Sequence, residues 1–126
     1  MHRIGFISFV GLLLVLSACN HNPGPSALDS FAQCVTDSGA IIFTSVTCSH
    51  CREQQRLFGD SYEFIEAIEC SPNARNSEAQ RCLLANIRGT PTWVLYKDGK
   101  EVDRLEGRQA LEDLAIFTGC PLEVGE

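Results

Sequence analysis

The sequence predicts an α/β fold in which helices cover both faces of a mixed, four-stranded sheet. Two observations carry this prediction. Short apolar runs typical of strands alternate along the chain with stretches whose apolar residues recur at helical spacing. The last two strand-like runs are separated by Asp98-Gly99, a pair typical of a type I′ hairpin turn. Strands joined through helices tend to pair in parallel whereas a hairpin is antiparallel, so the order predicts a mixed sheet.

The first half of the folded chain is expected to supply two helices and one strand. The first helix should be capped by Ser26 and ended by Gly39, and its apolar residues recur at helical spacing: Leu28, Phe31, Ala32 and Val35. Residues 40–46 (AIIFTSV) are apolar enough for a strand buried on both faces. A polar helix is then expected over residues 48–58.

The second half supplies three further strands and two helices. Residues 66–70 are expected to form a short strand and residues 77–86 a helix. The hairpin strands are residues 92–96 and 101–105. A final amphipathic helix should end at Gly119, and its apolar positions are Leu111, Leu114, Ala115 and Phe117.

The N-terminal residues have the pattern of a bacterial export signal. A basic start precedes residues 4–16, an uncharged apolar run that is too short to span a bilayer comfortably. The closing Leu-Ser-Ala-Cys resembles a lipobox, in which Cys19 would carry lipid and become the first mature residue. The alternative is an ordinary signal peptide that contains a cysteine. We divide the chain into a signal peptide (1–18), a lipidated Cys19 with a flexible tether (19–26) and a folded domain (27–126).

Composition limits the partners and the location. Without residues 1–18 the chain keeps nine Lys and Arg against sixteen Asp and Glu, a net charge of −7. Nucleic acid is therefore not expected as a partner, because phosphate binding needs a basic face. The remaining 108 residues suffice for one domain, which we expect to be monomeric. We expect it outside the cytoplasm, held to a bacterial membrane by its lipid, where disulfides persist.

Cys48-Ser49-His50-Cys51 lies where the first strand gives way to a helix. A sulfur at a helix N-terminus meets unpaired backbone N–H groups that stabilise a thiolate, so Cys48 is the expected nucleophile. Cys51, one turn later, is the expected resolving thiol. A partly cationic His50 would lower the pKa of Cys48 and make the disulfide more oxidising. The alternative is an exposed histidine that only caps the helix.

The chain resembles the thioredoxin fold, a three-layer α/β/α sandwich, over residues 31–121. The resemblance rests on the CxxC after the first strand and on the Thr-Pro that opens the hairpin. It is strongest to the thioredoxin-like domain associated with bacterial vitamin K epoxide reductase homologues. The matching segments are TCSHCREQQRLFG (47–59), IECSPNARN (68–76), Cys82, GTPTW (89–93) and LEDLAIFTGC (111–120). This resemblance implies an extracytoplasmic disulfide carrier that exchanges electrons with a quinone-linked membrane protein.

The resemblance also implies that the Thr90–Pro91 bond is cis and faces Cys48, where the Thr90 backbone would pair with an extended substrate. The alternative is that Pro91 simply starts the strand. Trp93 is expected in the core, although it shares the strand parity of Pro91. The chain departs from the family in two ways. Thr47 and Ser49 stand where an aromatic residue and a proline are common, and residues 40–46 hold no buried acid.

Four further cysteines are expected to form structural disulfides. Cys70 ends a strand and Cys82 lies on the next helix, so a local bridge is plausible, and the resemblance favours the same pair. Cys34 and Cys120 lie near the ends of helices expected to run antiparallel to the first strand, which would bring them together away from Cys48. Cys34 with Cys82 is the competing pair.

We expect a thiol-disulfide oxidoreductase without a cofactor beyond the Cys48–Cys51 disulfide. The favoured function is an oxidase that gives disulfides to exported proteins and is reoxidised by a vitamin K epoxide reductase-like membrane protein. The first alternative is a reductase or isomerase fed electrons from the membrane, and the second is a non-catalytic binding lipoprotein. A metal site built from the CxxC, His50 and His21 is disfavoured, because structural zinc usually needs two such knuckles.

Overall fold

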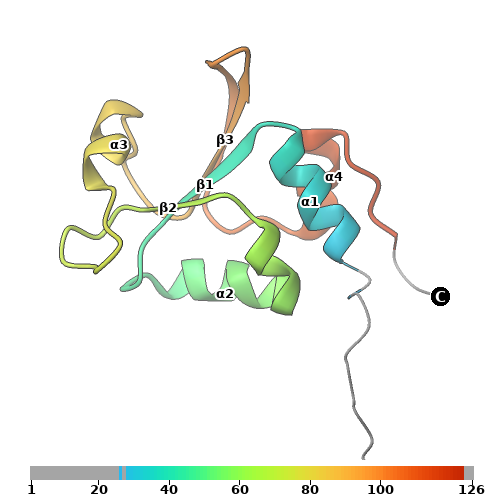
Figure 1. Ribbon diagram of the computed structural model, residues 1–126, viewed down its shortest axis with the longest axis horizontal. Coiled ribbons are helices and arrows are strands. Elements are labelled where there is room, and N and C mark those ends of the chain that lie inside the picture. The colour runs from blue at the N-terminus through green and yellow to red at the C-terminus, as the bar shows by residue number, and fades with distance from the viewer. Residues whose placement is uncertain (1–25, 27, 124–126) are drawn as a thin grey trace, which may run out of the picture.

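The computed structural model describes residue 26 and residues 28–123. The elements in chain order are α1 (Asp29–Asp37), β1 (Ala40–Thr44), α2 (Ser49–Phe58), the 3₁₀ helix η1 (Gly59–Phe64), β2 (Ala67–Glu69), α3 (Ala79–Leu84), β3 (Thr92–Lys97), β4 (Lys100–Glu106) and α4 (Leu111–Thr118) (Figure 1). This is the predicted order with η1 added. The expected signal peptide, Cys19 and nearly all of the tether lie outside the described residues. Within the part that is described, no helix has the length and apolar character to cross a membrane.

The four strands form one mixed sheet in the order β2-β1-β3-β4. β1 pairs in parallel with β2, and both remaining pairs are antiparallel. β1 therefore lies inside the sheet and carries the chain directly toward Cys48. The predicted α/β class and mixed sheet are confirmed.

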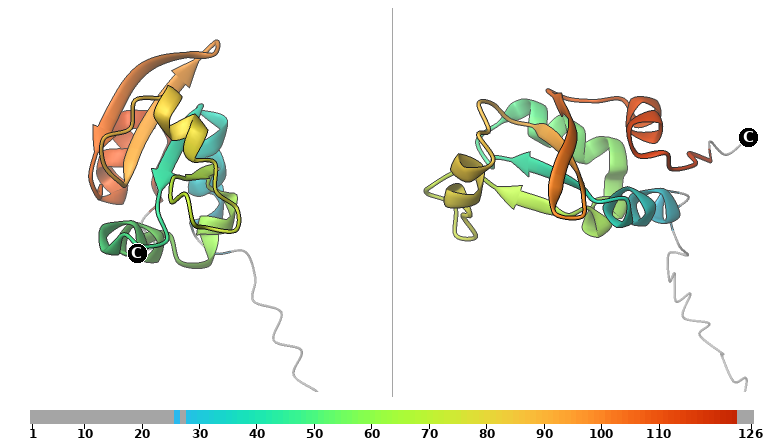
Figure 2. Two further views of the ribbon diagram at one scale, coloured as in Figure 1. Left: turned by 90° about the vertical axis from the view of Figure 1, so that its left-hand side faces the viewer. Right: turned by 90° about the horizontal axis from the view of Figure 1, so that it is seen from above.

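Helices cover the two faces of the sheet unequally (Figure 2). The larger core joins α1, α2 and α4 to one face of β1 and β3, around the fully buried Ile42, Trp93 and Leu114. The smaller core lies on the opposite face, where only Cys82 of α3 joins the buried strand residues Phe43, Ile68 and Val94. The helix that begins at Cys48 thus rests on the larger core, which fixes the position of its first turn.

Two predicted element ends are wrong. β1 ends at Thr44, and Val46 is exposed because the chain turns at once, with the Cys48 N–H donating to the Ser45 carbonyl at 3.1 Å. Helix α3 is shorter than residues 77–86, because the Glu78 N–H donates to a β2 carbonyl at 2.7 Å and holds the chain outside the helix. At the start of α1, Ser26 makes the expected capping contacts: its Oγ accepts from the Leu28 N–H at 3.4 Å, and its N–H donates to Asp29 Oδ2 at 2.9 Å.

Two turns need backbone conformations that few residues adopt. Asp98 and Gly99 have φ angles of 52° and 74°, which matches the predicted type I′ turn between β3 and β4. Gly39, at the predicted end of α1, has φ 93°, and a Cβ there would collide with the Tyr96 carbonyl oxygen. Glycine at position 39 therefore lets β1 begin directly beside β3.

Two disulfides fasten helices to the rest of the fold. Cys34 of α1 is bonded to Cys120, which follows α4, with 5.9 Å between the Cα atoms. Cys70, after β2, is bonded to Cys82 of α3, with a Cα separation of 5.8 Å. These are the expected pairs, and the competing pair of Cys34 with Cys82 is wrong. Cys48 and Cys51 are left as free thiols.

Candidate active site

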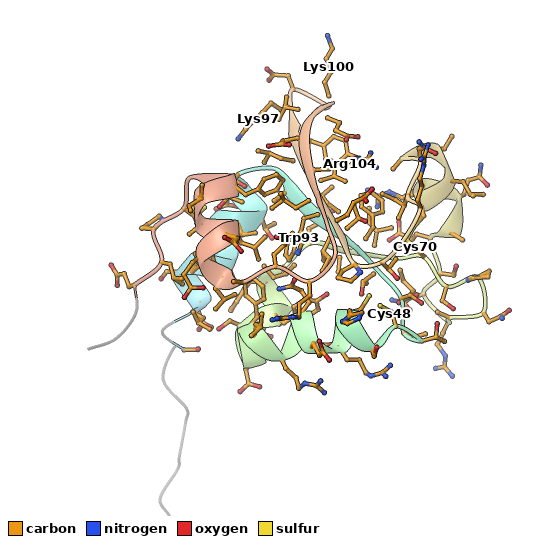
Figure 3. The ribbon with its side chains drawn as sticks, turned by 180° about the vertical axis from the view of Figure 1, so that it is seen from behind. Cys48, Cys70, Trp93, Lys97, Lys100 and Arg104 are labelled. Carbon is orange, nitrogen blue, oxygen red and sulfur yellow. A yellow bond between two sulfur atoms is a disulfide. The ribbon has the colours of Figure 1, made fainter. Side chains whose placement is uncertain are left out.

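Cys48 is the N-cap residue of α2 (Figure 3). Its backbone is extended, with φ −97° and ψ 119°, and its Sγ accepts a hydrogen bond from the Cys51 N–H at 3.2 Å. The sulfur thus satisfies one of the N–H groups that a helix start leaves without a partner. Cys48 is partly exposed, whereas Cys51 is 3% exposed. Only the first sulfur can therefore meet another protein.

The segment before β3 lies against Cys48. The Thr90–Pro91 peptide bond is cis, as the resemblance implied, and Pro91 is buried. The Thr90 carbonyl oxygen lies 3.2 Å from the Cys48 Sγ, a contact in which the protonated thiol is the donor. The Pro91 carbonyl accepts from the Gly107 N–H at 2.8 Å, which fixes this segment to the end of β4. A substrate joined to Cys48 would therefore lie beside the Thr90 backbone.

The two thiols have opposite acidities. Burial acts to raise the pKa of Cys48, but hydrogen bonds from the Cys51 and Thr90 side chains and from the Cys51 and His50 backbones outweigh it and lower the pKa below its usual value. Burial raises the pKa of Cys51, and its hydrogen bond with the Cys48 side chain raises it further, against a smaller opposing effect of Thr44. The exposed sulfur is thus the more readily ionised one.

His50 contacts an acid on its own helix. Its Nδ1 lies 3.3 Å from Glu53 Oε2, and the side chains of both residues are largely exposed. The same oxygen lies 3.7 Å from Nε of Arg108. Among the described hydrogen bonds none joins the imidazole to Cys48, and His50 lowers the pKa of Cys48 through its backbone. The alternative that His50 caps the helix is wrong, since Cys48 is the cap; the effect of the imidazole charge on Cys48 stays a prediction.

Sequence reasoning missed a buried acid near Cys51. Glu69, 5% exposed, lies opposite Thr44 in the parallel pair of β1 and β2. Its Oε1 accepts from the Ser71 N–H at 2.7 Å and the Val46 N–H at 3.3 Å. Glu69 and Cys51 line one cavity of about 210 Å³. Residues 40–46 hold no acid, and the neighbouring strand supplies one instead. A glutamate at the end of the short strand Ala67–Glu69 is the signal in the sequence that could have indicated it.

Tyr62 of η1 lines the same cavity. Burial raises the pKa of its phenol to about 12; the Thr44 hydroxyl opposes this slightly, and the charges of Cys51 and Glu69 add to it. The phenol is therefore protonated at neutral pH. A cavity of this size, lined by a hydroxyl, a carboxylate and a thiol, has the polarity and room for bridging water between Cys51 and Glu69.

A buried glutamine ties the redox helix to the sheet. Gln54 is fully buried one turn after Cys51, and its Oε1 accepts from the Trp93 Nε1–H at 3.3 Å and the Gln109 N–H at 2.7 Å. Its Nε2 donates to the Gln109 carbonyl at 3.1 Å. Trp93 is thus a core residue, as expected. No local pattern marks Gln54 as a structural residue, because its partners lie 39 and 55 residues away.

A largely apolar groove of about 480 Å³ adjoins the Cys48 loop. Thr47 and Thr90 line one part of it, and the Cys70–Cys82 disulfide lines another. Leu83 of α3 borders the groove and is 73% exposed. The groove therefore offers an apolar surface to a polypeptide whose cysteine has reached Cys48.

Within residues 26 and 28–123, no three His, Cys, Asp or Glu side chains gather as they would around a metal ion. His21, the other histidine weighed for a metal site, lies outside the described residues.

A protein with a CxxC at the start of a helix, facing a cis-proline segment on a mixed sheet, has the architecture of a thioredoxin-like redox protein. The thioredoxin family model matches residues 25–118, and the chain belongs to this family. The thioredoxins of Aeropyrum pernix and Halobacterium salinarum, the latter a mutant, share the fold. The first is 23% identical, with a TM-score of 0.51 over 75% of this chain and 82% of its own. The second is 18% identical, with a TM-score of 0.52 over 82% of this chain and 100% of its own.

Two curated relatives are similar in sequence. The thiol-disulfide oxidoreductase LTO1 of Arabidopsis thaliana is 31% identical over 98 residues, which cover 75% of this chain and 25% of that protein. A thioredoxin domain-containing protein 5 homolog of Drosophila melanogaster is 26% identical over 99 residues, covering 71% of this chain and 23% of that protein. The chain thus spans about a quarter of the length of these relatives.

Proposed function

We propose that this protein is a thiol-disulfide oxidoreductase in which Cys48 exchanges disulfides with a protein substrate and Cys51 completes the exchange. The observation that carries the proposal is the contrast between the two sulfurs. Cys48 is accessible at a helix N-terminus, beside the Thr90 backbone, with a lowered pKa. Cys51 is buried behind it, with a raised pKa. Thiol-disulfide exchange needs this division between an attacking and a resolving sulfur.

In the oxidising direction a substrate thiolate attacks Cys48 of the Cys48–Cys51 disulfide. The intramolecular S–S bond breaks, a mixed disulfide forms on Cys48, and Cys51 leaves as a thiolate that takes up a proton. A second substrate thiolate then attacks the substrate sulfur of the mixed disulfide and releases Cys48 as a thiolate. The substrate gains a disulfide, and the two electrons it loses reduce the CxxC pair. The raised pKa of Cys51 favours its protonation after the first step.

We favour the oxidase direction over the reductase or isomerase direction. The lowered pKa of Cys48 stabilises the reduced pair, which makes the disulfide a better oxidant. The substrates would be exported proteins with free cysteines, and a quinone-linked, vitamin K epoxide reductase-like membrane protein would restore the disulfide. Lipid on Cys19 would keep the domain at the membrane with that partner. Support for this arrangement comes from the lipobox-like sequence and from the family resemblance.

Equilibration of the mature protein with glutathione buffers of known potential tests the direction. We expect a reduction potential well above the value of about −270 mV known for thioredoxin. A value at or below that of thioredoxin would contradict the oxidase and favour the reductase.

Two substitutions test whether the protein exchanges disulfides at all. Cys51→Ser should trap a mixed disulfide on Cys48, because the resolving thiol is gone, and Cys48→Ser should trap none. A non-catalytic binding lipoprotein would keep its cellular function in Cys48→Ser. That outcome would overturn the proposal.

A further inference from the structure

Basic side chains gather around Cys48 although the protein as a whole is acidic. The chain holds 16 Asp and Glu against 10 Lys and Arg. Arg52, Arg88 and Arg108 nevertheless lie on three segments near Cys48. Arg52 is in the first turns of α2, Arg88 comes two residues before Thr90, and Arg108 follows Gly107, whose N–H donates to the Pro91 carbonyl. All three side chains are exposed.

Two of these arginines lie on segments next to the reacting sulfur. The Nη1 of Arg52 donates to the Val46 carbonyl at 3.3 Å, so this guanidinium lies along the loop that leads into Cys48. Arg88 comes two residues before Thr90, whose carbonyl touches the Cys48 Sγ, and it lines the apolar groove described above. Arg52 also lines the cavity shared by Cys51 and Glu69. The two arginines thus line the two hollows that adjoin the loop before Cys48.

The acids near this surface do not balance its positive charge. Within the described residues, Arg52 and Arg88 form no ion pair, whereas Arg81 and Arg104 are paired with Glu78 and Glu101 at 2.8 and 2.6 Å. Arg108 shares a single carboxylate, that of Glu53, with His50. Glu106 lines a cavity together with Arg88, and its charge also helps to raise the pKa of Arg104. Glu69 lines the same cavity as Arg52, but it is buried, and its Oε1 accepts from the Ser71 and Val46 N–H groups.

We propose that Arg52, Arg88 and Arg108 form a basic face that selects polypeptides with acidic residues flanking the reacting cysteine. This inference rests on the proposed exchange at Cys48. An extended chain advances about 3.3 Å per residue, so residues a few positions from a cysteine held on Cys48 would pass over the segments that carry these guanidinium groups. Their forked donors suit carboxylates, and the neighbouring groove would take an apolar side chain of the same polypeptide.

Exchange kinetics with matched peptides test the basic face. Two peptides would each carry one glutathione mixed disulfide and differ only in Asp or Lys at the flanking positions. We expect the reduced protein to react roughly tenfold faster with the acidic peptide at low salt, and the preference to shrink as salt screens the charges. Arg52→Gln with Arg88→Gln should abolish most of the preference. Neutral hydroxyethyl disulfide, which reports the intrinsic reactivity of Cys48, should react with every variant at a similar rate.

The control variant makes the same change of charge elsewhere. Lys97 and Lys100 lie at the β3–β4 hairpin tip, far from Cys48 (Figure 3). Lys97→Gln with Lys100→Gln should keep the preference. Equal rates with both peptides, or an equal loss of preference in the control, would overturn the basic face.

Binding of vesicles of anionic phospholipid that depends on Arg52 and Arg88, with equal peptide rates, would also overturn it and assign the face to a membrane. Failure to react even with hydroxyethyl disulfide would instead refute the proposed function.

Discussion

At the scale of single residues, the fold separates two chemically identical thiols. The extended backbone of Cys48 lets its sulfur cap α2, where N–H donors stabilise negative charge. Cys51 lies inside the first turn, where burial disfavours the thiolate. The CxxC spacing alone predicted this difference, because it follows from helix geometry. The positions of Glu53 beside His50 and of Glu69 in the cavity with Cys51 could not be predicted, because they depend on side-chain packing and on strand pairing.

Glu69→Gln tests whether the buried acid takes part in proton movement at Cys51. The amide keeps an acceptor for the Ser71 and Val46 N–H groups, but it cannot take up a proton from the cavity. We expect the step in which Cys51 displaces a mixed disulfide from Cys48 to slow about tenfold near neutral pH. Stopped-flow measurement of that step would check this. Glu66→Gln, an exposed acid nearby in sequence, is the control, and equal rates in both variants would refute the role.

Glu53→Gln tests the contact between His50 and its acidic neighbour. Removing the carboxylate takes a negative charge away from the first turns of α2, which should stabilise the Cys48 thiolate and raise the reduction potential. Exposed charges are worth at most about 1 kcal/mol to one another, so the rise should be on the order of 10–20 mV. Equilibration with glutathione measures it. A fall in the potential of Glu53→Gln would contradict this effect of the carboxylate.

At the scale of elements, the redox helix is held in place by distant segments. Hydrophobic periodicity and glycine positions predicted the helices and strands, because those signals are local. Helix η1, the early end of β1 at Thr44 and the short α3 were not predicted, because each depends on contacts that close only in the fold. The Glu78 N–H bond to β2, which delays the start of α3, is one such contact.

Gln54→Ala tests the link between α2 and the sheet. It would leave the buried Trp93 Nε1–H and Gln109 N–H without their acceptor. Each lost partner costs about 1–3 kcal/mol, so we expect the free energy of unfolding to fall by roughly 3 kcal/mol in urea denaturation. Gln55→Ala, at the exposed neighbouring position, should change it by less than about 0.5 kcal/mol. Similar values for the two variants would show that Gln54 does not stabilise the helix position.

At the scale of the whole molecule, the disulfides close loops of very different length. The Cys34–Cys120 bridge spans a separation of 86 residues and joins the first helix to the end of the last. The Cys70–Cys82 bridge spans 12 and fastens only α3. The pairing of Cys34 with Cys120 could be anticipated, because helix direction places both residues at one end of the sheet. The charge distribution around Cys48 could not, because it arises from three segments far apart in sequence.

Replacing Cys34 and Cys120 by alanine should lower the free energy of unfolding by about 4 kcal/mol. The disulfide limits the conformational entropy of the unfolded chain, and it does so more strongly for the longer of the two loops. Replacing Cys70 and Cys82 should cost less, about 3 kcal/mol, and should loosen α3 selectively. Urea denaturation of each variant, with Cys48 and Cys51 kept reduced, checks both values. A larger loss from the shorter loop would contradict this ordering.

The most direct test of the account is the pH dependence of alkylation of the reduced protein by iodoacetamide, with the labelled cysteine identified by mass spectrometry. Because a thiolate reacts and a thiol does not, the rate follows ionisation. We predict that Cys48 is labelled first, with a midpoint below that of free cysteine measured under the same conditions, and that Cys51 stays slow. Earlier labelling of Cys51, or a Cys48 midpoint at or above that of free cysteine, would contradict the division of roles between the two sulfurs.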